Sequence, residues 1–380
     1  MWTLKLVFWL SATLLIYIYA GYPLLVWLGS RRRRAAAGSV HLPATVSVVL
    51  VAHNEQQTIR RKLRQLFTVE EQARIIEVLV GSDGSTDATV DEVQAVHDPR
   101  IHLIAWDQRR GKPAVLNELI PRCRGEVVWL LDARQELDRA VLSRLLHAIA
   151  DPTVGVVSGE LIFRTGPQHT PCSSGLGWYW RYEKFLRKAE SNFRGVPGAT
   201  GACYLLRREL FCPIPENTLL DDVAIPMLIA AQGKRCRLQE AAWVLDEPSR
   251  APSQEAIRKR RTIAGVAQLV QMFPHWCLPG GHPLWWEFLS HKVLRLASPG
   301  ALVLMLGSSL ALWSQPVYRV LAVSQLACYA AAGCGWWFQR TGHPARILGI
   351  PLMFLTLNLT TFLALVDAWR GNYRVTWRKV

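Results

Sequence analysis

Acidic side chains follow short apolar runs at several points of the chain, and a basic loop follows another such run. The acidic residues are Glu55, Asp83 and Asp132, and the basic loop contains Lys112. A carboxylate can accept a hydrogen bond or a proton or bind a hard cation, and a lysine supplies a point charge for an anion. What these groups can do together depends on whether the fold brings them to one place.

The apolar runs before these residues are typical of strands buried on both faces of a parallel sheet, because they are short, continuous and rich in β-branched residues. They cover residues 46–52, 75–80, 101–105 and 127–131. Helical spacing of apolar residues follows the first and fourth runs, and Pro113 stands where a helix would begin after the third. This alternation predicts an α/β domain with a mostly parallel sheet flanked by helices, whose ligands bind beyond the carboxyl ends of the strands.

The composition is too apolar for an ordinary soluble enzyme, since 50% of the 380 residues are hydrophobic. The net charge of +15 would suit nucleic acid, an anionic membrane surface or a phosphate-rich substrate. The sequence has no common nucleic-acid motif, and its eight cysteines form no C-x-x-C pair. We therefore expect no nucleic acid partner, no zinc site and no disulfide framework.

Residues 6–28 form an almost continuous apolar stretch, long enough to cross a hydrocarbon core of about 30 Å at about 1.5 Å per residue. A secretory signal peptide would have a shorter apolar region with its charges in front. Here only Lys5 precedes the stretch, and Arg31 to Arg34 follow it. The positive-inside rule therefore predicts that the N-terminus is outside and the following domain is cytosolic.

Three further apolar stretches, near residues 297–313, 320–338 and 347–366, are candidate spans. Three spans after a cytosolic domain would put the C-terminus outside, yet a tail with Arg370, Arg374, Arg378 and Lys379 favours the inside. Either one of the three segments does not cross the membrane, or the tail is an exception to the positive-inside rule. We expect a transmembrane helix at 1–30, a cytosolic domain at 45–254, an amphipathic interfacial segment at 255–290 and a C-terminal transmembrane region at 291–380.

Five motifs resemble, in order and spacing, the glycosyltransferase-A fold of family 2, particularly membrane-bound enzymes similar to cellulose, chitin-oligosaccharide and hyaluronan synthases. They are VSVVLVAHNE at 46–55, VGSDGSTD at 80–87, GKPAVLN at 111–117, GACYLLRR at 201–208 and LDD at 220–222. Each motif is weak by itself, but their shared order and their placement at strand ends argue against coincidence. The resemblance runs from the first candidate span to the last.

The resemblance implies roles for four polar residues. Glu55 and Asp83 should hold the nucleoside, with Asp83 accepting a hydrogen bond from the base. Lys112 should face the diphosphate, whereas the neighbouring Arg109 and Arg110 are expected at the surface. Asp132 takes the first place of the family's Asp-any-Asp motif, where a carboxylate meets a divalent cation, Mg²⁺ or Mn²⁺, that bridges the diphosphate oxygens.

Arg134 departs from that motif, because it stands where the family has the second carboxylate. Three explanations are open. The metal is held by Asp132, diphosphate oxygens and water alone; Arg134 takes over part of the charge neutralisation; or Arg134 points outward and does neither. The departure weakens the prediction of a metal more than that of the fold.

The pair Asp221 and Asp222 matches the acidic pair at the acceptor side of the family, in which the second residue is the general base. We therefore expect Asp222 to be catalytic. Asp221 has a simpler interpretation, since it follows Thr218 by three residues as in a capping box before a helix near Pro226.

Arg258 and Arg261 stand where polymerising relatives carry a Gln-x-x-Arg-Trp motif, so the resemblance implies that they help the diphosphate to bind and leave. Thr262 replaces the tryptophan of that motif, which contacts the acceptor sugar in those relatives. Processive synthesis is therefore in doubt.

The resemblance implies an inverting hexosyltransferase that moves a sugar from a nucleotide diphosphate sugar, such as a UDP-sugar, to a glycan or lipid-linked acceptor in exopolysaccharide synthesis. The expected setting is the plasma (inner) membrane, with several spans and a cytosolic catalytic domain. Expected partners are the nucleotide sugar, the acceptor, the lipid bilayer and polysaccharide export subunits. The alternative is a non-catalytic glycosyltransferase-like subunit of a polysaccharide synthesis complex, and the presence of Asp83, Asp132 and Asp222 argues against it.

Overall fold

The structure is a computed structural model of the chain. It describes residues 1–31, 41–163, 172–247, 252–341 and 346–371. Arg32 to Arg34 and most of the basic tail, on which the predicted topology partly rests, lie outside the described residues.

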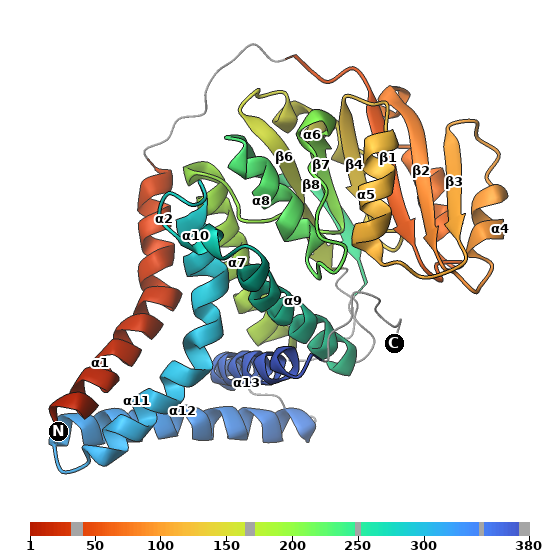
Figure 1. The fold of residues 1–380 in the computed structure, drawn as a ribbon. Helices are drawn as coiled ribbons and strands as arrows, with labels where there is room; N and C mark the ends of the chain where they lie inside the picture. The colour runs from red at the N-terminus through yellow and green to blue at the C-terminus, as the bar shows by residue number, and fades with distance from the viewer. Residues whose placement is uncertain (32–40, 164–171, 248–251, 342–345, 372–380) are drawn as a thin grey trace.

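In the described part of the chain, eight strands form one sheet in the order β3-β2-β1-β4-β7-β6-β8-β5 (Figure 1). Their bounds are β1 Val46–Ala52, β2 Ile75–Asp83, β3 Ile101–Trp106, β4 Val127–Leu131, β5 Glu136–Leu137, β6 Val154–Phe163, β7 Cys203–Arg207 and β8 Arg235–Asp246. β3, β2, β1 and β4 run parallel, and β7 is antiparallel to both β4 and β6. β8 is parallel to β6 and antiparallel to β5. The predicted α/β fold with a mostly parallel sheet is confirmed.

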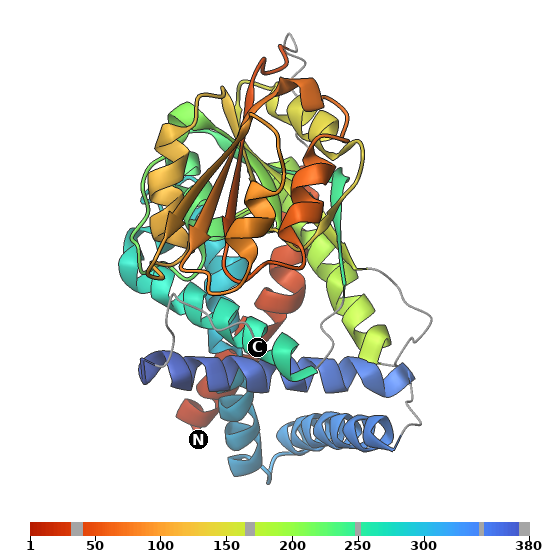
Figure 2. The same cartoon turned by 90° about the vertical axis from the view of Figure 1, so that its right-hand side faces the viewer.

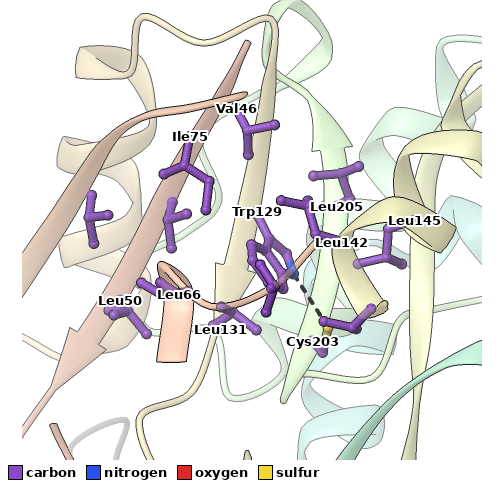
Figure 3. Close-up of a cluster of buried hydrophobic side chains, with 14 of the residues drawn as sticks. Val46, Leu50, Leu66, Ile75, Trp129, Leu131, Leu142, Leu145, Cys203 and Leu205 are labelled. Carbon is purple, nitrogen blue, oxygen red and sulfur yellow. Dashed lines mark hydrogen bonds between the residues drawn. The ribbon is translucent and has the colours of Figure 1, made fainter. Parts of the chain in front are cut away.

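Helices cover both faces of the sheet. One face carries α3 (Ile59–Leu66), α4 (Thr89–Gln94) and α6 (Val141–Ile149); the other carries α5 (Lys112–Arg122), α8 (Asp221–Ala231) and α9 (Pro252–Met272). Trp129 lies fully buried in the first of these two cores, and its Nε1 donates to Cys203 Sγ at 3.4 Å (Figure 3). The N–H of this buried indole is thereby satisfied by a residue of β7, the strand next to β4.

Four stretches among the described residues are long and apolar enough to cross a membrane: Trp2–Ser30, Trp285–Ala311, Pro316–Arg340 and Gly349–Trp369. The first contains α1 (Trp2–Ile16) and α2 (Tyr22–Ser30), and the second runs from α10 (Trp285–Glu287) to α11 (Ser298–Ala311). The other two are α12 (Pro316–Arg340) and α13 (Gly349–Trp369). One N-terminal and three C-terminal helices were predicted and are confirmed, but the second stretch begins earlier than expected, inside the segment 255–290.

These helices form two pairs. α1 packs against α11, and α12 packs against α13 at a steep angle to the first pair in both views (Figures 1 and 2). α13 also packs along α9 and along α7 (Cys172–Phe193), the long helices on this side of the domain. In Figure 1 the carboxyl ends of the parallel strands face the side on which α9 and α13 lie.

Candidate active site

The loops after β1 and β2 lie side by side and are held together by hydrogen bonds. Asn54 adopts the left-handed backbone conformation with φ 56°, and its Oδ1 accepts from Thr86 N at 2.8 Å. Glu55 N donates to Thr89 Oγ1 at 2.7 Å, and the Glu55 carboxylate accepts from Thr58 Oγ1 at 2.6 Å. Glu55 thus lies beyond the end of β1, and its predicted part in nucleoside binding stays a prediction.

Asp83 is buried, and both oxygens of its carboxylate hold the loop that leads to Lys112. Oδ1 accepts from Arg110 N at 2.6 Å, and Oδ2 accepts from Gly111 N at 2.9 Å. Gly84 allows this close approach, because its φ is 61° and a side chain there would meet the backbone of the same loop at 2.7 Å. Asp83 therefore positions the start of α5, while its predicted hydrogen bond to a base remains a prediction.

Lys112 is the first residue of α5, and its ammonium lies between two carboxylates. Nζ is 3.0 Å from Asp132 Oδ1 and 3.4 Å from Asp221 Oδ2. Burial opposes the charge on Lys112, but the carboxylates, Asp132 first, outweigh it and raise the pKa of the lysine above its ordinary value. Side chains from the end of β4 and from the starts of α5 and α8 thus meet at one cation.

Asp221 is not a helix cap, contrary to the prediction. α8 begins at Asp221, no side chain caps it, and Thr218 Oγ1 donates to Pro215 O at 2.6 Å. The ammonium of Lys112 attracts the carboxylate more strongly than a backbone N–H does, because both partners are charged. Pro226 lies inside this helix rather than at its start.

Asp222 follows in the first turn of α8 and is half-buried. Burial and then the carboxylate of Asp221 raise the pKa of Asp222 from 3.8 to about 6. The carbonyl group of Asp222 is also fixed in place. Pro226, four residues later, has no N–H to donate to it, and Asp222 O accepts from Ala199 N at 2.7 Å instead. Gly201 lies directly against the carboxylate, where a side chain would meet Oδ2 at 2.9 Å. A carboxylate with a pKa close to neutrality suits proton removal.

Arg134 binds Asp246, the last residue of β8, through both sides of its guanidinium, with Nε to Oδ1 at 3.0 Å and Nη2 to Oδ2 at 2.7 Å. Gln135 Nε2 donates to the same carboxylate at 3.1 Å, and the buried Lys62 of α3 donates to Gln135 O. Arg134 is therefore neither an unpartnered surface residue nor free to act alone on a ligand. Asp246 and Lys62 were not predicted, although Asp246 follows an apolar strand as the other carboxylates of the site do.

Arg258 and Arg261 were both predicted to help the diphosphate to bind and leave, but the structure places them differently. Arg261 is half-buried on α9, interacts electrostatically with Asp221, Asp222 and Asp132, and donates from Nη2 to Leu219 O at 3.4 Å. Arg258 is exposed. The structure thus brings Arg261, rather than Arg258, to the carboxylates.

Arg109 is a second cation of the site that was expected at the surface. It is half-buried and interacts electrostatically with Asp83 and Arg261. Arg110 is exposed, as expected, and pairs with Glu118 at 2.5 Å. The side chains of these two neighbouring arginines therefore point in different directions, one toward the site and one toward the surface.

The donor set of this site fits a divalent cation poorly. Within the described residues, no three His, Cys, Asp or Glu side chains are grouped as a metal site requires. Asp132 accepts from Lys112, and the place of a second carboxylate is taken by Arg134. Mg²⁺ and Mn²⁺ prefer several oxygen ligands, whereas the neighbours here include an ammonium and a guanidinium. The side chains around Asp132 therefore do not fit the predicted Mg²⁺ or Mn²⁺ as they are placed, because Lys112 already occupies the carboxylate.

Comparison with known proteins identifies the domain. Residues 47–212 match the family model described as Glycosyl transferase family 2. These residues form a family 2 glycosyltransferase domain. An N-acetylglucosaminyltransferase of Azorhizobium caulinodans is 26% identical over 178 residues, which are 46% of this chain and 45% of that protein. The succinoglycan biosynthesis protein ExoO of Rhizobium meliloti is 34% identical over 102 residues, or 27% of this chain and 29% of that protein.

The chain spans less than half the length of these two relatives, so they identify the glycosyltransferase domain rather than a whole protein. Among solved structures, the mannosyltransferase PcManGT from Pyrobaculum calidifontis, in complex with GDP-Man and Mn2+, superposes with a TM-score of 0.70. It is 22% identical, and the superposition covers 97% of this chain and 100% of that chain. The predicted glycosyltransferase-A fold is confirmed by this likeness.

A buried polar network joins the glycosyltransferase domain to the membrane helices. His291, in the second candidate span, lies between Glu190 Oε1 at 2.8 Å from Nδ1 and Glu183 Oε2 at 3.0 Å from Nε2. Tyr22 of α2 donates to Glu190 at 2.6 Å, and Arg295 donates to Glu183. Each imidazole nitrogen thus faces a carboxylate oxygen of α7. Helix α7 thereby provides partners for the polar side chains of this candidate span.

Proposed function

We propose that the chain is an inverting glycosyltransferase that moves a hexose from a nucleoside diphosphate sugar to an acceptor at the membrane. The observation that carries the proposal is the shared cluster of Lys112, Asp132, Asp221 and Asp222 at the strand ends of a family 2 domain. One end of the cluster offers a cation for a leaving diphosphate, and the other offers a base for an incoming hydroxyl.

Asp222 is the proposed general base. Its carboxylate takes the proton of an acceptor hydroxyl while that oxygen attacks the anomeric carbon, and the bond from this carbon to the diphosphate oxygen breaks. Because its pKa is about 6, Asp222 is ionised at neutral pH and still basic enough to accept a proton. Attack from the face opposite the diphosphate inverts the anomeric carbon and needs no covalent intermediate.

The donor is proposed to bind along the ends of β1, β2 and β4. Glu55 and Asp83 lie where the nucleoside would enter, and Asp83 also fixes the loop before Lys112. Lys112 and Arg261 stabilise the negative charge that develops on the leaving diphosphate. Arg258, exposed and one helical turn before Arg261, is proposed to guide the phosphates of an entering donor.

The acceptor is proposed to be a glycan or a lipid-linked sugar held at the bilayer. An open apolar groove with a volume of about 650 Å³ lies between α1, α11 and α13, lined by residues such as Leu14, Leu304 and Phe362. A hydrocarbon chain in this space would keep its polar end on the side of α9 and the strand ends (Figure 1). The name of one relative, a succinoglycan biosynthesis protein, supports a part in exopolysaccharide synthesis. A UDP-sugar donor and polysaccharide export subunits as partners are proposed from the resemblance alone, and no nucleic acid is proposed.

The proposed setting is the plasma (inner) membrane with the domain in the cytosol, where nucleotide sugars are made. Arg260 of α9 pairs with Asp367 near the end of α13, which supports a C-terminus on the same side as the domain. One helix of the pair α12 and α13 would then not cross the bilayer. The steep angle of that pair to α1 and α11 supports this topology (Figures 1 and 2).

Transfer is tested with the purified full chain, a set of labelled nucleotide sugars that includes UDP-N-acetylglucosamine, UDP-glucose and GDP-mannose, and a bacterial lipid extract. Label should move from one donor into lipid or polymer with inversion, and Asp222→Asn should not support this movement. A protein that binds these donors but transfers none of them would be the non-catalytic subunit instead.

A further inference from the structure

We propose that Lys112 occupies the place of the divalent cation in this site, so that the diphosphate of the donor binds without a metal. The inference rests on the proposed function and concerns how the same site holds a nucleoside diphosphate. It is carried by the positions of two cations, Lys112 and Arg134, relative to three carboxylates.

The ammonium of Lys112 already bridges carboxylates as a metal ion would. It is 3.0 Å from Asp132 and 3.4 Å from Asp221, and only 15% of the lysine side chain is exposed. A lysine ammonium has three N–H donors, and the hydrogen bond to Asp132 uses one of them. Asp221 Oδ2 is close enough for an ion pair but accepts no hydrogen bond from the described residues, so a further donor is available to an oxygen of the diphosphate. The lysine can therefore link Asp132 to the diphosphate in the way that a bridging cation links them.

The residues that could complete a metal site are already bound to other side chains. Arg134 stands where a second carboxylate would be, and its guanidinium is bound on both sides to Asp246. The carboxylate of Asp246 also accepts from Gln135, so three of its about four lone-pair sites are already used. A metal entering here would lie against the guanidinium of Arg134, which repels it.

The site supplies positive charge for a diphosphate without a metal. Lys112 and Arg261 lie among the carboxylates of Asp132, Asp221 and Asp222. These side chains are positioned before the diphosphate arrives, as electrostatic stabilisation of a leaving group requires.

The test measures binding of UDP and GDP to the purified full chain by isothermal titration, in EDTA and in Mn²⁺. We expect the dissociation constant of the preferred nucleotide to differ by less than about threefold between the two buffers, and Lys112→Met to weaken it by about 10- to 100-fold in both, as loss of a charged hydrogen bond would. Binding that requires Mn²⁺ would overturn the inference and leave the proposed function standing. Absence of nucleotide binding in both buffers would overturn both.

A gain of metal dependence provides a second measurement. Arg134→Asp places a carboxylate beside Asp132 and Asp246, so Mn²⁺ should raise the melting temperature and the UDP affinity of this variant but not of the parent. Arg122→Asp, an equal change of charge at an exposed residue of α5, is the matched control. Equal Mn²⁺ stabilisation of the parent and Arg134→Asp would show that the parent already has a metal site and would refute the inference.

Discussion

Arg134 and Asp246 form a two-pronged ion pair that joins the loop after β4 to the end of β8, at 3.0 and 2.7 Å. The two residues are 112 positions apart in the sequence. Asp246 is buried, whereas 42% of the Arg134 side chain is exposed. The pair fixes the backbone directly after Asp132, so it can influence donor binding without touching the donor.

Asp246→Asn should therefore lower both stability and donor affinity. The amide cannot accept both arms of the arginine, and we expect the free energy of unfolding to fall by about 1–3 kcal/mol. Asp98→Asn is the control, because Asp98 binds Arg100 with the same two-pronged geometry at 2.9 and 2.8 Å on another part of the domain. Denaturant unfolding and nucleotide titration of both variants decide the outcome. Equal donor affinities in the two variants would mean that the Arg134 pair only stabilises the fold.

Asp222→Asn should leave donor binding nearly unchanged and reduce transfer by about 10²- to 10⁴-fold, the usual contribution of a general base. The amide keeps the size of the side chain but cannot take the proton. Asp221→Asn should instead weaken donor binding, since it removes one of the two carboxylates that hold Lys112. Single-turnover transfer and donor titration separate the two effects. An Asp222→Asn protein as active as the parent would remove Asp222 from the mechanism.

Transfer should depend on pH in the range of the Asp222 pKa. Burial and Asp221 raise that pKa from 3.8 to about 6, so the rate should climb about tenfold per pH unit below pH 6 and level off above it. The folded protein also binds this proton more tightly than the unfolded chain does. Stability from this group is thus greatest below the unfolded pKa of 3.8 and is lost as the pH rises through about 6. A rate that stays constant between pH 5 and pH 7 would contradict the assignment.

Cys212 offers a direct test of topology, because it is an exposed thiol in the glycosyltransferase domain. A membrane-impermeant maleimide should fail to label it in intact cells and should label it after the cells are opened. Cys212→Ser identifies the labelled site, and the buried Cys123 and Cys203 should not react in the folded protein. Labelling of Cys212 from outside would exclude a cytosolic domain and a cytosolic donor.

The sequence predicted the framework of the domain, because the parallel strands β1, β2 and β4 are almost entirely buried on both faces. β1 and β4 begin and end where the apolar runs do, and β2 and β3 only extend beyond them. A strand covered on both sides needs a continuous apolar run whatever its neighbours are. For the same reason the order of strands placed Asp83, Lys112 and Asp132 near one edge of the sheet.

The second membrane helix was predicted to begin too late, because His291 and Arg295 interrupt its apolar run. His291 lies between Glu183 and Glu190, and Arg295 donates to Glu183; both glutamates belong to α7, about a hundred residues earlier in the chain. The hydropathy of a segment does not reveal which distant side chains contact it, so it could not reveal these partners.

The pairing of the charged residues was decided by the tertiary structure alone. The sequence displays Lys112, Asp132, Arg134, Asp221 and Asp246 but not which of them meet. A capping box was predicted for Asp221 from a local spacing, and an ion pair with Lys112 from a distant helix replaced it. Ion pairing falls off with distance in space, and the fold sets that distance independently of separation along the chain. The sequence therefore determined the fold class and the edge of the sheet at which the site lies, whereas only the tertiary structure decided that Lys112 pairs with Asp132 and Asp221 and that Arg134 pairs with Asp246.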